Sequence, residues 1–284
     1  MSIMRPVFML WVLSVCAPAI AHADSTVTAC SVDVQTGAGT NLAQALQAGG
    51  NIYFNCPRAS TIAMTRSYTI NAETWLWAGD AITLSGSGFL LTLNPSSTRS
   101  FNFLINGNAH FDHMALSHFA LPRISIYHSI NAAALRVSPA GSLSLDHVTI
   151  TYSDTPVGSL GALAITSSVF RNNYGIAVVS LGTGLSIRNS SFSANASAVF
   201  MAGGIIAGSA FTSNTQGAID VDYPRMDVQI RDCSFQGNSG TSAILMSQLG
   251  AAVSGAAVTL RRDTFDGNDG GMSAGAVSIQ DPGC

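Results

Sequence analysis

The stretch SSFSAN, residues 190–195, returns in altered form along the second half of the chain and decides its fold. Each copy keeps a phenylalanine, an asparagine three positions later and an aliphatic residue five positions before the phenylalanine. The copies read ITSSVFRNN (165–173), IRNSSFSAN (187–195), IAGSAFTSN (206–214), IRDCSFQGN (230–238) and LRRDTFDGN (260–268). Repeats spaced by about 20 to 30 residues predict a solenoid, in which each unit buries its apolar side only against its neighbours.

A second short apolar segment follows the first four copies of the motif. These segments read GIAVV (175–179), SAVFM (197–201), GAIDV (217–221) and SAILM (242–246). Helical repeats are the competing class of solenoid, but these units are rich in glycine and serine and place β-branched or aromatic residues at alternate positions. Each coil is therefore expected to contain a strand, a Phe-x-x-Asn turn, a second strand and a variable connector, and the strands to form parallel sheets.

Earlier segments carry the same alternation without the turn motif. HFDHMALSHF (110–119) has Leu116 at the phenylalanine position, and LSLDHVTITYSD (143–154) has Ile150 there. ITLSGSGFLLTLN (82–94) is a further candidate coil. The array is thus expected to begin near residue 75.

The repeated Phe and Asn predict two ladders inside the stack. Equivalent residues of successive coils lie about 4.8 Å apart in a wound parallel sheet, so rings can pile up and amides can hydrogen-bond from coil to coil. Asparagine also tolerates the left-handed backbone conformation that a sharp bend needs. Ligand binding by these amides is the alternative, but repetition favours a structural role. The expected ladders consist of Phe170, Asn173, Phe192, Asn195, Phe211, Asn214, Phe235, Asn238, Phe265 and Asn268.

The paired motifs FSANASAV (192–199) and FTSNTQGAI (211–219) resemble the FxxN and GGA[ILV] repeats of chlamydial polymorphic outer-membrane proteins and related bacterial surface proteins. Through them the array, roughly residues 75–280, resembles the right-handed parallel β-helix (pectin-lyase-like) superfamily. The resemblance implies an all-β fold, a single right-handed parallel β-helix solenoid over residues 75–284. It says little about activity.

The N-terminus carries Arg5, an apolar run over residues 7–15 and the small-residue ending Ala21-His22-Ala23. This pattern predicts a secretory signal peptide, residues 1–23, cleaved after Ala23. The apolar run is too short for a membrane anchor, which needs about 20 residues. The mature chain is therefore expected to be secreted or held at the cell surface, without a membrane span.

Residues 24–74 are expected to form an N-terminal cap and the first strands. Within TNLAQALQAGGNIYFNCP (40–57), Leu42, Ala45 and Leu46 share one face of a short helix that Gly49-Gly50 ends. Such a helical cap shields the open end of the stack, whose strand edges otherwise invite aggregation.

The cysteines left after the signal peptide are Cys30, Cys56, Cys233 and Cys284. An even number in an exported chain indicates disulfides, but sequence alone does not fix their connectivity. Pairing of Cys30 with Cys56 is preferred, because both precede the repeats. The pairing of Cys233 and Cys284 stays open.

Composition excludes some function classes. All twelve basic residues are arginine, so a catalytic lysine or Schiff base is excluded. The net charge of −3 leaves no basic surplus for nucleic acid, and no nucleic-acid partner is expected. No cofactor is expected either.

The segment AIDVDYPRMDVQIRD (218–232) is the best candidate for catalysis. Strand alternation puts Asp220 and Asp222 on one outer face, about 7 Å apart, and Arg225 follows after a turn. The pattern is typical of a calcium or acid/base patch, and also of a solvated strand face on which acids pair with arginines.

A second polar cluster consists of His110, Asp112, His113 and His118, with Asp146-His147 as its counterpart one coil later. Stacked histidines can bind a metal or line a polar groove, but they can equally be ordinary polar positions on the outer face of two coils. No metal site is assigned from this pattern.

Phe200 and Leu245 are large apolar residues at outward positions of the second strands. They are either surface hydrophobic residues, covered in part by a connector, or a docking strip for a protein partner or glycan. Connector conformations do not follow from the sequence, so both interpretations stand.

Export, repeat architecture and weak catalytic motifs favour a secreted bacterial β-helix surface or extracellular protein. Its expected role is non-catalytic, in adhesion or in binding a carbohydrate or surface-protein partner. The alternative is a polysaccharide lyase or glycoside hydrolase acting on an acidic glycan, with Asp220 and Asp222 holding Ca²⁺ and Arg225 as the base in the lyase case. A matrix protein without a specific ligand is a third possibility.

Overall fold

The computed structural model describes residues 24–34, 37, 39–57, 60–79, 82–85, 103–119, 130, 133–182, 184–247 and 256–280. The expected signal peptide and Cys284 lie outside these ranges.

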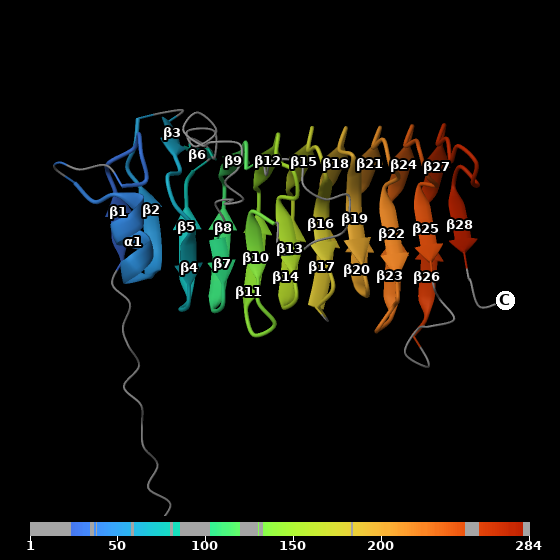
Figure 1. Ribbon diagram of the computed structural model, residues 1–284, viewed down its shortest axis with the longest axis horizontal. Coiled ribbons are helices and arrows are strands. Elements are labelled where there is room, and N and C mark those ends of the chain that lie inside the picture. Colours follow the sequence, from blue (N-terminus) through green and yellow to red (C-terminus); the bar gives the residue numbers. More distant parts are fainter. Residues whose placement is uncertain are drawn as a thin grey trace, which may run out of the picture.

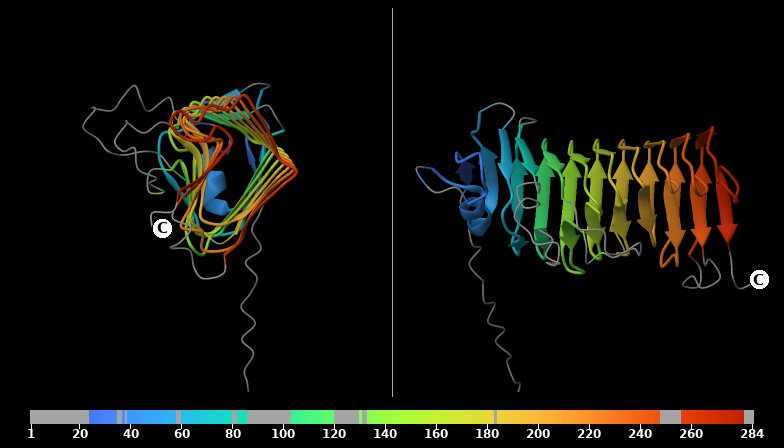
Figure 2. Two further views of the ribbon diagram at one scale, coloured as in Figure 1. Left: turned by 90° about the vertical axis from the view of Figure 1, so that its right-hand side faces the viewer. Right: turned by 45° about the horizontal axis from the view of Figure 1, so that its top comes forward.

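Three long parallel sheets run along the molecule, and the chain passes through them in turn, coil after coil (Figure 1). Seen along the long axis, the sheets surround one elongated core (Figure 2). The sheet called A here consists, in spatial order, of β1 (Ser25–Val27), β2 (Gly50–Phe54), β5 (Thr74–Trp77), β8 (Asn108–Asp112), β11 (Ser142–Asp146), β14 (Ala162–Thr166), β17 (Gly184–Arg188), β20 (Gly204–Ala207), β23 (Val228–Arg231) and β26 (Val258–Arg261).

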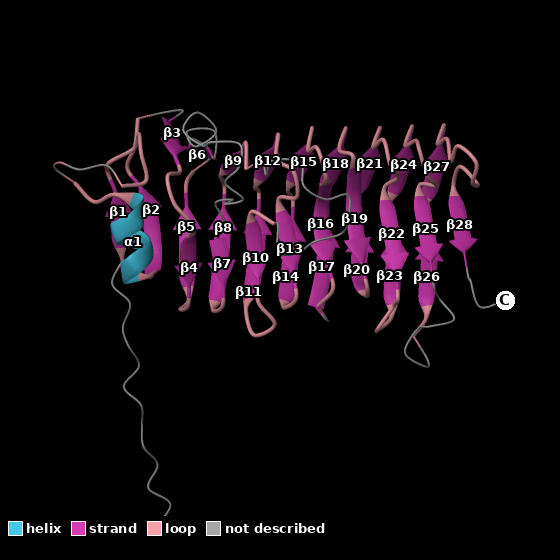
Figure 3. Ribbon diagram, viewed as in Figure 1, coloured by secondary structure: helices cyan, strands magenta, loops and turns pink. Residues whose placement is uncertain are grey.

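The other two sheets complete each coil, and strands dominate the whole stack (Figure 3). Sheet B consists of β3 (Ser60–Ala63), β6 (Ile82–Ser85), β9 (Ala115–Ser117), β12 (Thr149–Thr151), β15 (Val169–Arg171), β18 (Ser191–Ser193), β21 (Ala210–Thr212), β24 (Ser234–Gln236) and β27 (Thr264–Asp266). Sheet C consists of β4 (Tyr68–Ile70), β7 (Phe103–Ile105), β10 (Leu135–Val137), β13 (Val157–Ser159), β16 (Ile176–Ser180), β19 (Ser197–Met201), β22 (Ile219–Asp222), β25 (Ile244–Ser247) and β28 (Val277–Gln280).

Each coil contains three strands where the sequence predicted two. A single residue with positive φ separates the sheet A strand from the sheet B strand and splits what the sequence suggested to be one strand. In successive coils this residue is His113, His147, Ser167, Asn189, Gly208, Asp232 and Arg262. Residue types this varied leave no signature from which the bend could be predicted.

A second positive-φ residue separates sheet B from sheet C. It is His118, Tyr152, Asn172, Ala194, Ser213, Gly237 and Gly267 in successive coils. The expectation that the ladder asparagines themselves take the left-handed conformation is wrong, because the residue before each of them takes it; Ala194, with φ of 52°, precedes Asn195. The side chain of each ladder asparagine can therefore point into the stack.

The phenylalanine ladder fills the core beneath sheet B. Phe170, Phe192, Phe211, Phe235 and Phe265 pair in register, with ring centroids 4.8, 5.1, 5.0 and 4.9 Å apart and nearly parallel planes. Leu84, Leu116 and Ile150 hold the same position in earlier coils. Coil spacing therefore sets the ring spacing, and aliphatic residues also fit the position.

The asparagine ladder runs parallel to the rings. Asn173, Asn195, Asn214 and Asn238 each donate from Nδ2 to Oδ1 of the ladder asparagine in the next coil, at 2.8, 3.0, 2.8 and 2.8 Å. Each amide also donates to a backbone carbonyl of the preceding coil, as Asn195 does to Phe170 at 3.0 Å. These buried amides are therefore hydrogen-bonded in several directions at once.

A serine ladder, which the sequence analysis missed, lies at the bend between sheets A and B. The backbone N–H of Ser168 donates to Ser190 Oγ, and that of Ser190 donates to Ser209 Oγ, both at 3.2 Å. Cys233 follows in the same row as a buried free thiol whose pKa burial raises to about 11. Since burial keeps this thiol protonated at neutral pH, Cys233 substitutes for serine as a structural residue.

The helix α1 (Leu42–Ala48) covers the N-terminal end of the stack, with Leu42, Ala45 and Leu46 buried as predicted. Asn41 caps it: its side chain accepts from the Gln44 backbone N–H, while the Gln44 side chain accepts from the Asn41 N–H. In the part of the chain that is described, no helix has the length and apolar character to cross a membrane.

All three sheets begin within residues 24–74. Strands β2, β3 and β4 pair with β5, β6 and β7, so a complete coil precedes residue 75. A disulfide joins Cys30, just after β1, to Cys56, just after β2. The first coils are thus covalently tied beside the capping helix.

Candidate functional site

Aromatic side chains gather on the outer face of sheet A near its N-terminal end. In β5 the alternation buries Leu76 and turns Trp75 and Trp77 outward, and Tyr53 of β2 lies in register with Trp77. His110 of β8 lies in register with Trp75. These four residues form what we call the aromatic strip.

Three rings of the aromatic strip, those of Trp75, Trp77 and His110, are nearly parallel. Trp75 stacks on His110 with centroids 3.6 Å apart and on Trp77 with centroids 5.9 Å apart. The Trp75 indole Nε1 donates to Glu73 Oε1 at 3.0 Å, which fixes the ring. Burial lowers the pKa of His110, so its imidazole stacks as a neutral ring. Tyr53 is 43% exposed and Trp77 39%, so both side chains are accessible to a ligand.

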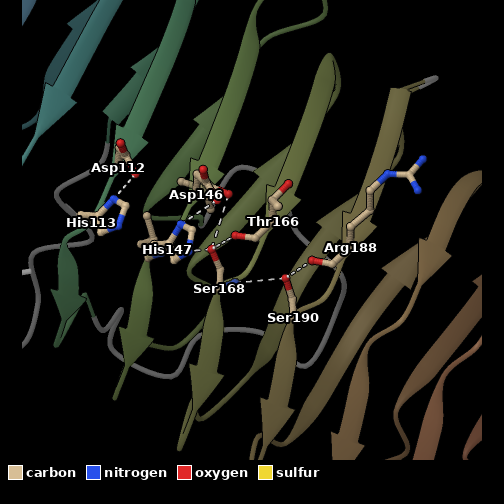
Figure 4. Close-up of polar contacts among 10 residues, drawn as sticks. Asp112, His113, Asp146, His147, Thr166, Ser168, Arg188 and Ser190 are labelled. Atoms are coloured by element: carbon tan, nitrogen blue, oxygen red, sulfur yellow. Dashed lines mark hydrogen bonds and ion pairs between the residues drawn. The ribbon is translucent and has the colours of Figure 1, made fainter.

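Two Asp–His pairs continue the row of Trp77 along the stack. Asp112 and Asp146 lie in register, and His113 and His147 follow them at the bend into sheet B. Nδ1 of His113 contacts Asp112 Oδ1, and Nδ1 of His147 lies 3.0 Å from Asp146 Oδ1 (Figure 4). The two imidazole rings stack with centroids 4.4 Å apart. The coil alignment expected from the sequence therefore brings these four side chains together.

The predicted members of this cluster do not all meet. His110 lies on the sheet face against Trp75, while His118 lies at the second bend and stacks on Tyr152 with centroids 5.3 Å apart. The two histidines therefore lie in different surroundings, His110 on sheet A and His118 between sheets B and C.

Arginines occupy the C-terminal part of the same row. Arg188, Arg231 and Arg261 stand at equivalent positions of β17, β23 and β26, with Ala207 between the first two. Arg262 forms a bidentate pair with Asp232, at 2.6 and 2.8 Å. Hydrogen bonding to Arg262 lowers the pKa of Asp232. The outer face of sheet A thus passes from aromatic, through acidic and imidazole, to basic side chains.

Asp220 and Asp222 share the outer face of sheet C, as their alternation predicts. Asp220 lies in register between Phe200 and Leu245, and burial together with Asp222 raises its pKa to about 7. Its Oδ1 is buried and has no hydrogen-bond partner among the described residues. Asp222 accepts a hydrogen bond from Ser247 Oγ at 2.9 Å.

Arg225 is exposed and does not join the two aspartates. Its backbone N–H donates to the carbonyl of Ala202 at 2.8 Å, and its guanidinium forms no ion pair with any described carboxylate. Asp220 and Asp222, the expected calcium ligands, therefore share one face, but Arg225, the expected base, forms no ion pair with them.

Phe200 is buried, which agrees with the interpretation that a connector covers it. It is 4% exposed and packs with Val179 and Ile130, the last contributed by the connector that precedes β10. Gly158 in the same row permits this packing, because a Cβ there would lie 2.7 Å from the Cβ of Ala133. Leu245 is half-buried beside Asp220.

The aromatic strip was missed at the sequence level, although a signal exists. TWLW (74–77) alternates aromatic with aliphatic residues, which predicts that Trp75 and Trp77 share a face. The segment has no Phe-x-x-Asn motif, and its neighbour His110 comes 35 positions after Trp75. Without the register, the four aromatic rings could not be recognised as neighbours.

Comparison with known proteins concerns the fold. No curated protein and no solved structure matches the chain. The sequence profile of the right-handed beta helix region matches residues 125–279, more than half of the chain, and the described residues of this range form stacked parallel strands. The chain therefore belongs to the right-handed beta helix family.

Proposed function

We propose that this chain is an exported β-helix protein that binds a glycan on the outer face of sheet A, without catalysis. The observation that carries the proposal is the aromatic strip, with Trp77 and Tyr53 exposed side by side in register. Flat aromatic rings combine a large apolar face with a polar edge, which suits the C–H faces and hydroxyls of sugars. Exposed aromatic groups gathered in this way indicate a binding surface.

The rest of the face supports an extended, acidic ligand. Arg188, Arg231 and Arg261 lie along the same row as Trp77, several coils away. Successive coils are about 4.8 Å apart, so a polysaccharide lying along the stack passes the aromatic rings, then the two Asp–His pairs and then the arginines, which are the side chains that would bind its acidic groups. Arginine binds carboxylate and sulfate groups through its planar fork.

The extracellular location is part of the proposal. The N-terminal pattern ending at Ala23 predicts export, and the disulfide between Cys30 and Cys56 suits an oxidising compartment. A glycan of a cell surface or matrix is the corresponding partner class.

The test uses the mature chain on an array of neutral, uronate and sulfated polysaccharides. Wild-type protein is expected to bind uronate or sulfated polymers, and Trp77→Ala to weaken binding about tenfold or more, which is about 1.4 kcal/mol. Tyr174→Ala is the matched control, because Tyr174 is 59% exposed away from sheet A. Absence of binding across the array, or equal binding by Trp77→Ala, contradicts the proposal.

Acid–base chemistry at Asp220 is the second candidate function. The observation that favours it is a carboxyl group with a pKa near neutrality, with Asp222 on the same face. Incubation with uronate polymers tests it through the absorbance of unsaturated products. A lyase is supported if the wild-type protein forms product and Asp220→Asn does not. Absence of product with every polymer contradicts this candidate function.

A further inference from the structure

The bend between sheets A and B brings together the ligand types that transition metals prefer. One ligand atom each from Asp112, His113 and His147 lies within 4.8 Å of the others. They meet because β8 and β11 pair in register, which puts the residues that follow them one above the other (Figure 4). We propose that these three side chains bind a divalent transition-metal ion of the zinc type. This proposal is independent of the proposed function.

The ligand chemistry selects the class of metal. Two imidazoles and one carboxylate suit Zn²⁺ and its neighbours, whereas Ca²⁺ and Mg²⁺ prefer oxygen ligands only. Zinc bonds of about 2.0 to 2.2 Å put tetrahedral ligand atoms about 3.4 Å apart. The most distant pair of ligand atoms therefore needs to close by about 1.4 Å or less, while Asp112 and His113 are already in contact.

Exposure permits this movement. The side chain of His113 is 38% exposed and that of His147 is 50% exposed, so both rings are free to rotate out of their parallel stack. Rotation is required, because the lone pairs of stacked rings run parallel instead of converging. Asp112 is only 12% exposed at its side chain and supplies the fixed ligand.

A second carboxylate lies beside one of the ligands. Asp146 Oδ1 lies 3.0 Å from Nδ1 of His147, which is ion-pair distance, and accepts no hydrogen bond from any described residue in the present orientation of the ring. Metal-binding histidines commonly donate their other N–H to a carboxylate, and the rotation that brings His147 to the metal is expected to form such a bond to Asp146. Asp146 is therefore the expected positioning residue of the proposed site.

The experiment measures Zn²⁺ binding by titration calorimetry, using mature protein purified without a polyhistidine tag. Asparagine is the replacement of choice, because Asn189 holds the same left-handed bend position, with φ of 49° against 50° for His113. Wild-type protein is expected to bind one Zn²⁺ per chain. His113→Asn and His147→Asn are expected to weaken binding about 100-fold or more, and Asp146→Asn about 10- to 100-fold.

His118→Asn is the matched control and is expected to bind as wild type does. His118 also stands at a left-handed bend, with φ of 58°, and Asn172 holds the equivalent position two coils later. Circular dichroism melts establish that all variants fold. Failure of the wild type to bind Zn²⁺ stoichiometrically, or unchanged binding by His113→Asn and His147→Asn, overturns the proposal.

Discussion

Asn195 shows how much one side chain contributes to this fold. Its Oδ1 accepts from both the backbone N–H and the side chain of Asn173, at 3.1 and 2.8 Å. Its Nδ2 donates to Phe170 O and to Asn214 Oδ1, both at 3.0 Å. All of these partners are buried, so water does not replace the amide when it is removed.

Asn195→Ala is therefore expected to be strongly destabilising, by about 2 to 4 kcal/mol, because it leaves buried donors and acceptors unpaired. Urea unfolding of both chains measures the loss. Ser193→Ala on the outer face of β18 serves as control and is expected to stay within about 0.5 kcal/mol of wild type. Comparable midpoints for the two variants argue against a structural ladder.

Phe192 tests the other ladder. Phe192→Ala removes a fully buried ring between Phe170 and Phe211 and is expected to cost about 3 to 5 kcal/mol. Phe192→Leu is expected to cost less than about 1.5 kcal/mol, because Leu116 holds the equivalent position three coils earlier. Thermal melts of the two variants decide whether the position needs an aromatic ring or only apolar volume.

At the scale of elements, the sequence predicted the array but not the three-sided coil. The Phe-x-x-Asn motif marks the bend between sheets B and C, and the alternation after it marks the sheet C strand. The bend between sheets A and B depends on backbone conformation at a position that accepts His, Ser, Asn, Gly, Asp and Arg. No residue type identifies it.

The candidate sites were predictable only in part, for a related reason. Alignment of Asp112-His113 with Asp146-His147 follows from the repeat, and the register bears it out. Burial of Phe200 depends on a connector whose path the sequence does not specify. The aromatic strip depends on pairing between β2, β5 and β8, where the spacing between coils is irregular.

Strand β22 carries a prediction about pH. The pKa of Asp220 rises from its ordinary value of 3.8 to about 7 through burial between β19 and β25. Between these values the folded chain keeps a proton that the unfolded chain has released. The free energy of unfolding is therefore expected to fall as pH rises from about 4 to about 7 and to level off above that.

Asp220→Asn is expected to remove this slope and to raise the melting temperature above about pH 7, because the neutral amide avoids a buried charge. Thermal melts over the same pH range measure both effects. Asp266→Asn, on the outer face of β27, is the control and is expected to keep the wild-type slope. A wild-type slope in Asp220→Asn shows that another group is responsible.

For the whole molecule, the two parts of the chain differ in what they contribute. The match to the beta helix family covers residues 125–279, where the Phe and Asn ladders lie. The capping helix, the disulfide, the aromatic strip and His113 all precede that region. The coils within residues 125–279 thus continue the three sheets, and with them the outer faces, that begin in the N-terminal coils.

The disulfide is expected to matter beyond its own coil. Replacing Cys30 and Cys56 by alanine removes a cross-link between residues 26 positions apart. This change is expected to lower the free energy of unfolding by about 3 kcal/mol. Loosening the cap also exposes strand edges of the first coil, so light scattering is expected to rise on heating. Calorimetry with and without reductant measures the effect, and the double variant is expected to be insensitive to reductant. A wild-type midpoint unchanged by reduction contradicts this role.

At the bend between sheets A and B, the seven described positions hold six residue types with nearly the same φ, from 49° at Ser167 to 59° at Gly208. Geometry at this position is therefore set by the backbone, and the side chain is left free to vary. Substitutions at this position in successive coils can therefore place chosen functional groups in a row, about 4.8 Å apart. Such a row of side chains suits the binding of mineral surfaces and polyelectrolytes, because their charges also repeat at fixed intervals.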